Sequence, residues 1–108
     1  MAAVNLNTEK FHKIMHTEGA VLVDFWAPWC TYCRKISSAY DKVADQNEGK
    51  LIVAKVNIDE EEALAEQEGI EVIPTLVLYH NGKSIGSITA PESKARIDSF
   101  LQEALAKQ

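Results

Sequence analysis

The chain has 108 residues, of which 46% are hydrophobic and 25% charged, and its formal net charge at pH 7 is −5. This length and composition suit one hydrophobic core, so we expect a single domain over residues 1–108. No apolar run approaches the roughly 20 residues that cross a bilayer, and the first residues lack the basic and apolar stretches of a signal peptide. We therefore expect a cytoplasmic protein without a membrane partner. The acidic balance also argues against nucleic acid, which needs basic patches.

Strands and helices are expected to alternate from the start of the chain. Residues 2–6 can form a short edge strand, and Asn7 or Thr8 can cap a helix that Gly19 ends. The next strand, over about residues 20–26, is almost continuously apolar, which is typical of a strand that is covered on both faces.

Asp24 interrupts that apolar strand. An ionisable group is costly to bury, so Asp24 either turns to solvent or is a buried acid with a raised pKa. Perturbed carboxylates gather at functional sites, which favours a buried acid that moves protons for the chemistry nearby.

Two cysteines, Cys30 and Cys33, follow the strand at the expected start of a helix that runs to about residue 46. A spacing of three residues places the two sulfurs about one helical turn apart, close enough to bond. The helix N-terminus stabilises a thiolate and lowers the pKa of the thiol at its start. We therefore predict Cys30 as the nucleophile and Cys33, one turn into the helix, as the resolving thiol.

A zinc site is the main alternative for a C-x-x-C pair. Structural zinc needs two further ligands, and the chain has no other cysteine, while His12, His16 and His80 are poorly placed candidates. The pattern therefore favours redox chemistry, with no metal or organic cofactor required. One cysteine pair also fits a reducing compartment, where disulfides are catalytic.

The segment after this helix predicts a second parallel strand and an acidic helix. Residues 51–57 read as the strand, joined to the first through the helix in a right-handed βαβ unit. Asp59 and Glu62 form a potential capping box for a helix over residues 60–68. Seven acidic residues and no lysine or arginine lie between Lys55 and Lys83, a run that could favour basic partners.

The last third of the chain predicts a hairpin and a final helix. Pro74 precedes a strand over residues 76–80, either as an ordinary strand-start proline or in a cis bond that forms a tight turn. The Asn81-Gly82 pair predicts a hairpin to residues 83–89, and an amphipathic helix follows over about 92–106. We expect an α/β protein with a mixed sheet between helices.

The cysteine segment, WAPWCTYCRK, resembles the active-site segment of thioredoxins. The stretches VDFW before it, KVNID from Lys55 and IPTL from Ile73 resemble other thioredoxin landmarks in the family's order, over about residues 5–105. The resemblance implies the thioredoxin fold, a central mixed β-sheet flanked by helices on both faces. It also implies a monomer that reduces disulfide-containing protein substrates and receives electrons from a thioredoxin reductase.

The resemblance also implies roles for individual residues. It supports Asp24 as a buried acid in proton transfer, with Lys55 close enough to tune it, although Lys55 can equally extend along its strand to solvent. It implies a cis Ile73–Pro74 bond beside the cysteines, where the preceding backbone pairs with substrate. The predicted catalytic residues are Cys30, Cys33, Asp24 and Lys55, and the predicted substrate-binding residues are Trp29, Thr31, Tyr32, Ile73 and Pro74.

Three departures from the family leave its details open. Thr31-Tyr32 stands where most thioredoxins have Gly-Pro, Ser38 replaces a kinking proline, and Thr89 falls where glycine often borders the substrate groove. The altered dipeptide allows a more oxidising isomerase or oxidase as an alternative. A non-enzymatic binding or chaperone module with a redox switch is another alternative, and the side chain of Thr89 could restrict partner docking.

Overall fold

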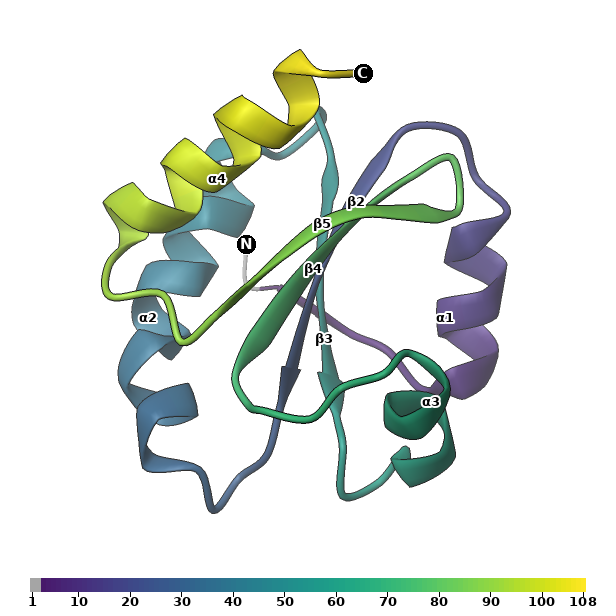
Figure 1. Cartoon of the computed structure of the whole chain (residues 1–108), viewed down its shortest axis with the longest axis vertical. Coiled ribbons are helices and arrows are strands. Elements are labelled where there is room, and N and C mark those ends of the chain that lie inside the picture. Colours follow the sequence, from purple (N-terminus) through teal and green to yellow (C-terminus); the bar gives the residue numbers. More distant parts are fainter. Residues whose placement is uncertain (1–2) are drawn as a thin grey trace.

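The computed structural model, which describes residues 3–108, has a five-stranded sheet in the order β1-β3-β2-β4-β5 (Figure 1). The first three strands in this order are parallel, whereas β4 is antiparallel to β2 and β5 is antiparallel to β4. The strands are β1 (Val4–Asn5), β2 (Ala20–Trp26), β3 (Ile52–Asn57), β4 (Thr75–His80) and β5 (Lys83–Thr89), and the helices are α1 (Thr8–Met15), α2 (Thr31–Gln46), α3 (Glu62–Gln67) and α4 (Lys94–Ala106). The predicted mixed sheet is thus confirmed.

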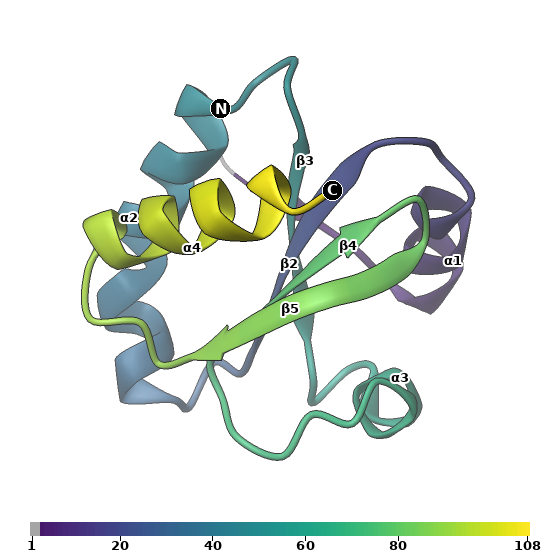
Figure 2. The same ribbon diagram turned by 45° about the horizontal axis from the view of Figure 1, so that its top comes forward.

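Helices cover both faces of the sheet, as predicted. Figures 1 and 2 show α2 and α4 together on one face and α1 and α3 on the other. Two apolar clusters fill these layers: Tyr40 and Ile97 belong to the cluster beneath α2 and α4, and Phe11 and Leu64 to the cluster beneath α1 and α3. Within residues 3–108, no helix is both long and apolar enough to cross a bilayer.

The central strand β2 lies between β3 and β4, so both its edges are hydrogen-bonded. Its residues from Val21 to Phe25 are all buried, which explains the continuous apolar pattern. Asp24 lies opposite Lys55 of β3 and Leu76 of β4. The carboxyl end of this strand leads directly to the two cysteines.

The capping box predicted at Asp59 is wrong. α3 begins at Glu62, and its N-cap residue Glu61 makes no side-chain capping bond. The Glu61 carboxylate instead accepts hydrogen bonds from the backbone N–H of Thr8, at 2.6 Å, and from its hydroxyl, at 3.1 Å. Asp59 accepts its hydrogen bond from the Trp29 indole, so both Asp59 and Glu61 are used in tertiary contacts and neither caps the helix.

Candidate active site

Cys30 and Cys33 form a disulfide at the start of α2, with their Cα atoms 5.2 Å apart. Cys30 is the N-cap residue, and its sulfur accepts a hydrogen bond from the backbone N–H of Cys33 at 3.1 Å. This bond and the positive end of the helix dipole stabilise negative charge on the Cys30 sulfur once the pair is reduced. Both side chains are buried, with Cys30 9% exposed and Cys33 3%.

Trp29 projects beside the disulfide and is held there by an acidic residue. Its side chain is 66% exposed, yet its indole N–H is shared between the two carboxylate oxygens of Asp59, at 2.9 and 3.1 Å. The backbone N–H of Asp59 in turn donates to the side-chain oxygen of Asn57 at 2.9 Å. Asp59 is a site residue that the sequence analysis missed, because its position before a helix matched a capping pattern.

The Ile73–Pro74 peptide bond is cis, as the resemblance implied. Ile73 packs against the cluster that contains both cysteines, so this turn forms a second wall of the site. The carbonyl of Pro74 accepts a hydrogen bond from the backbone N–H of Ala90 at 2.8 Å. In the part of the chain that the structure describes, Ile73 makes no backbone hydrogen bond, so its N–H and carbonyl remain open to a ligand.

Asp24 is buried, with 1% of its surface exposed, and its Oδ1 atom has no hydrogen-bond partner among residues 3–108. Burial in the sheet raises the pKa of its carboxyl from 3.8 to about 7, although the positive charge of Lys55 acts in the opposite direction. The solvent-facing alternative for Asp24 is therefore wrong. A carboxyl with this pKa can accept or release a proton near neutral pH.

Lys55 is half-buried and lies beside Asp24 in the sheet register. Its ammonium nitrogen lies 4.5 Å from the ring centroid of Trp26, a cation–π contact. No ion pair joins it to Asp24 among residues 3–108, so Lys55 influences the carboxylate through its nearby charge and packs on Trp26.

The two residues between the cysteines have different surroundings. Thr31 is exposed, whereas Tyr32 is half-buried and packs against both the disulfide cluster and the core beneath α2 and α4. The Tyr32 hydroxyl donates to the carbonyl of Pro91 at 2.9 Å. This contact joins residues far apart in sequence, and no local pattern could have indicated it.

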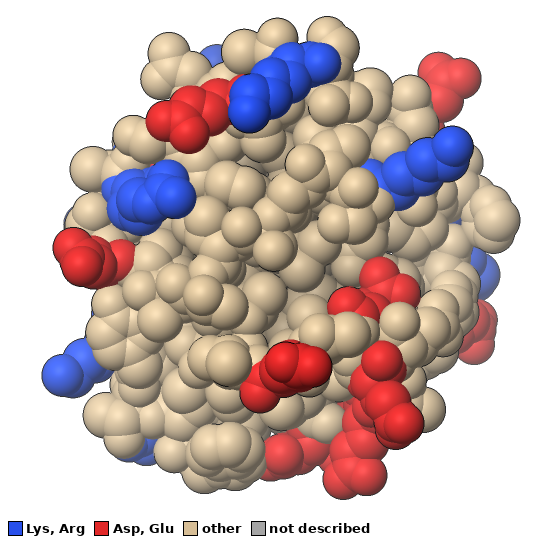
Figure 3. All heavy atoms as spheres, viewed as in Figure 1, with Lys and Arg blue, Asp and Glu red and all other residues tan. Residues whose placement is uncertain are grey.

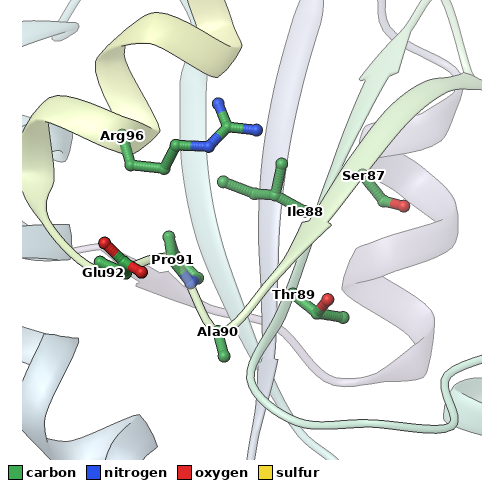
Figure 4. Close-up of a pocket in the computed structure, with 7 residues that line it drawn as sticks. All are labelled: Ser87, Ile88, Thr89, Ala90, Pro91, Glu92 and Arg96. Atoms are coloured by element: carbon green, nitrogen blue, oxygen red, sulfur yellow. The ribbon is translucent and has the colours of Figure 1, made fainter.

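The end of β5 and the loop that follows border the cis-proline turn, where the Ala90 N–H bonds the Pro74 carbonyl. A hollow of about 580 Å³ is lined by Ser87, Ile88, Thr89, Ala90, Pro91, Glu92 and Arg96 (Figure 4). Thr89 is an ordinary strand residue opposite Thr75. Ala90 is the residue with a left-handed backbone, at φ 44°, so the conformation that favours glycine falls at Ala90 rather than Thr89.

A reactive cysteine pair at a helix N-terminus, beside a cis-proline turn, defines a thiol–disulfide oxidoreductase. The family model described as Thioredoxin matches residues 2–103. Thioredoxin 1 of Nostoc sp. is 37% identical over 105 residues, covering 96% of this chain and 98% of the relative. The thioredoxin of Synechocystis sp. is 39% identical over 92 residues, covering 85% of this chain and 86% of the relative.

A solved structure has the same fold. A mutant thioredoxin from Halobacterium salinarum NRC-1 superposes with a TM-score of 0.85 at 24% identity, covering 95% of this chain and 90% of the other. The chain belongs to the thioredoxin family. It is a protein-disulfide reductase that acts through its C-x-x-C dithiol, and the expected thioredoxin fold is confirmed.

Proposed function

We propose that Cys30 attacks the substrate disulfide and that Cys33 resolves the intermediate. The Cys30 thiolate forms a mixed disulfide with one substrate sulfur and releases the other as a thiolate. Cys33 then loses its proton and attacks the Cys30 sulfur, which frees the reduced substrate and leaves the Cys30–Cys33 disulfide. The observation that carries this order is the hydrogen bond from the Cys33 N–H to the Cys30 sulfur at the start of α2.

Asp24 is the proposed acceptor of the Cys33 proton. The raised pKa of about 7 makes its carboxylate a base of suitable strength near neutral pH, whereas an ordinary aspartate is too weak a base. Asp24 lies three residues before Ala27, which packs with both cysteines. Lys55 limits the rise in the pKa of Asp24 and is a tuning residue.

The docking surface proposed for a protein substrate consists of Trp29, Thr31, Ile73 and Pro74, with Tyr32 beneath it. The open backbone of Ile73 suits pairing with an extended substrate segment, and the exposed ring of Trp29 offers apolar contact next to the disulfide. Electrons come from a thioredoxin reductase, and the chain works as a cytoplasmic monomer.

Single cysteine variants test the order of attack. We expect reduced Cys33→Ser to accumulate a covalent complex with insulin, whose disulfides serve as the substrate, because the resolving thiol is missing. Cys30→Ser should form no such complex under the same conditions. Mass spectrometry of the products distinguishes the two, and a complex formed through Cys33 in the Cys30→Ser variant would reverse the assignment.

The reduction potential distinguishes a reductant from the more oxidising alternative. Neither side chain of Thr31-Tyr32 makes a hydrogen bond to the Cys30 sulfur within the described residues, and the Tyr32 hydroxyl is engaged by Pro91. A general reductant should have a potential near the value of about −270 mV found for thioredoxin. Equilibration against dithiothreitol measures it, and a value above about −200 mV would favour an isomerase or oxidase.

A further inference from the structure

Two hydrogen bonds attach the loop of residues 90–92 to the active site, one to the cis-proline turn and one to the start of α2. The N–H of Ala90 donates to the carbonyl of Pro74 at 2.8 Å, and the carbonyl of Pro91 accepts from the Tyr32 hydroxyl at 2.9 Å. Because proline has no N–H, its carbonyl is the only backbone group of Pro91 that can be held by a hydrogen bond. The loop thus connects the cis-proline turn to the active-site helix.

The loop needs such attachments to keep its shape. Ala90 has φ 44°, a left-handed conformation that is unfavourable for a residue with a Cβ atom. Pro91 is buried, whereas Thr89 and Ala90 are exposed on the surface beside Pro74. An extended chain that pairs with Ile73 at the site would therefore meet Thr89 and Ala90 next to it, and the position of these two residues depends on how the loop is held.

We propose that Tyr32 is a positioning residue for protein substrates: its hydroxyl fixes the 90–92 loop against the site, so that the groove is already shaped for an extended segment of a disulfide-containing protein. This inference rests on the proposed function. It gives the dipeptide between the cysteines a role in substrate selection, exerted through Pro91 and independent of the thiol chemistry. A small disulfide that reaches only the sulfurs does not use the loop.

Tyr32→Phe removes the hydroxyl and keeps the ring in the core. We expect the variant to show a KM for insulin about two- to tenfold higher than that of the wild-type chain, the range that one hydrogen bond represents, with kcat unchanged. The rate with bis(2-hydroxyethyl) disulfide and the reduction potential should remain as in the wild type. An equal loss with both substrates, or no change with either, would contradict the proposal.

Tyr79→Phe is the matched control, because it removes another tyrosine hydroxyl, bonded to Glu68 at 2.6 Å, outside the proposed docking surface. It should leave the ratio of the insulin activity to the small-disulfide activity unchanged.

Amide hydrogen exchange gives a second readout: the Ala90 N–H should exchange faster in Tyr32→Phe than in the wild type or the control. An unaltered exchange rate would show that the hydroxyl does not hold the loop.

The two proposals can fail separately. A wild-type chain that reduces neither insulin nor the small disulfide contradicts the proposed function and, with it, the role of Tyr32. A wild-type chain that reduces both, together with a Tyr32→Phe variant that retains the same KM for insulin, contradicts the role of Tyr32 alone.

Discussion

Asp24 is a buried carboxylic acid whose ionisation opposes the folded state. Its pKa is 3.8 when exposed in the unfolded chain and about 7 in the folded protein, because the sheet excludes water from the charged form. Between pH 3.8 and about 7, the folded state therefore binds the Asp24 proton more tightly than the unfolded state does. Stability from this group is fully present below pH 4 and is lost as the pH rises through 7, by about 4 kcal/mol in total.

Asp24→Asn removes this dependence. We expect the variant and the wild type to have similar free energies of unfolding near pH 4, and the variant to be more stable by about 4 kcal/mol at pH 8. Urea unfolding of the oxidised proteins at a series of pH values measures the difference. A constant difference across this range would mean that Asp24 does not titrate with a raised pKa.

The sequence was informative about residues whose role depends on local position. An acid within an apolar strand and a cysteine at a helix start could both be recognised, since strand burial and helix ends are local properties. Lys55 could not be placed in the same way. Its ammonium group lies over Trp26, and this position depends on which side chains face each other across β2 and β3.

Among the elements, the β4–β5 hairpin illustrates a turn fixed by backbone conformation. Asn81 and Gly82 have φ values of 52° and 82°, as the Asn-Gly pair predicted. Gly19 also binds this turn: it donates from its N–H to the Asn81 side chain at 2.8 Å and accepts at its carbonyl from the Asn81 N–H at 3.0 Å. A Cβ atom at Gly82 would collide with the carbonyl oxygen of Met15.

Gly82→Ala should consequently destabilise the protein more than Gly49→Ala. Both glycines have a left-handed φ, 82° and 81°, but a Cβ atom at Gly49 would meet no atom of the described chain within 4 Å. We expect a loss of about 1 kcal/mol for Gly49→Ala from the backbone alone, and a further 1–3 kcal/mol for Gly82→Ala from the collision. Thermal or urea unfolding measures both, and equal losses would contradict the steric contribution.

Most elements could be predicted because their periodicity and turn residues agree with the final packing. The start of α3 could not, since Asp59 of the expected capping box accepts its hydrogen bond from Trp29, and the actual N-cap residue, Glu61, bonds Thr8. The Tyr32–Pro91 contact was also beyond prediction, because it depends on where α2 lies relative to the loop before α4. Both cases involve tertiary partners that compete with local signals.

At the scale of the whole molecule, charge is unevenly distributed. Figure 3 shows acidic side chains gathered at the lower right of the surface, over α3 as placed in Figure 1. Asp59, in the acidic run before α3, accepts a hydrogen bond from Trp29, the residue directly before Cys30. A partner with positive charge near its disulfide should therefore be drawn to the site from solution.

Ionic strength provides the corresponding test. For a basic disulfide peptide, kcat/KM should fall about two- to fivefold between 20 mM and 500 mM NaCl, because salt screens attraction between exposed charges. An acidic peptide of the same length should show no fall. The double variant Glu62→Gln/Glu66→Gln should weaken the salt dependence, while Glu103→Gln on α4 should preserve it; identical behaviour of both peptides would exclude steering by this surface.

The sheet divides the apolar interior into two clusters, and each meets the disulfide cluster at a half-buried residue: Tyr32 for the side of α2 and α4, Ile58 for the side of α1 and α3. Substitutions deep in one layer can then be compensated within that layer. During divergence, either half of the interior can change composition while the redox chemistry is conserved. A change in packing at Tyr32 or Ile58 should reach the cysteines more directly than a change deeper in either cluster.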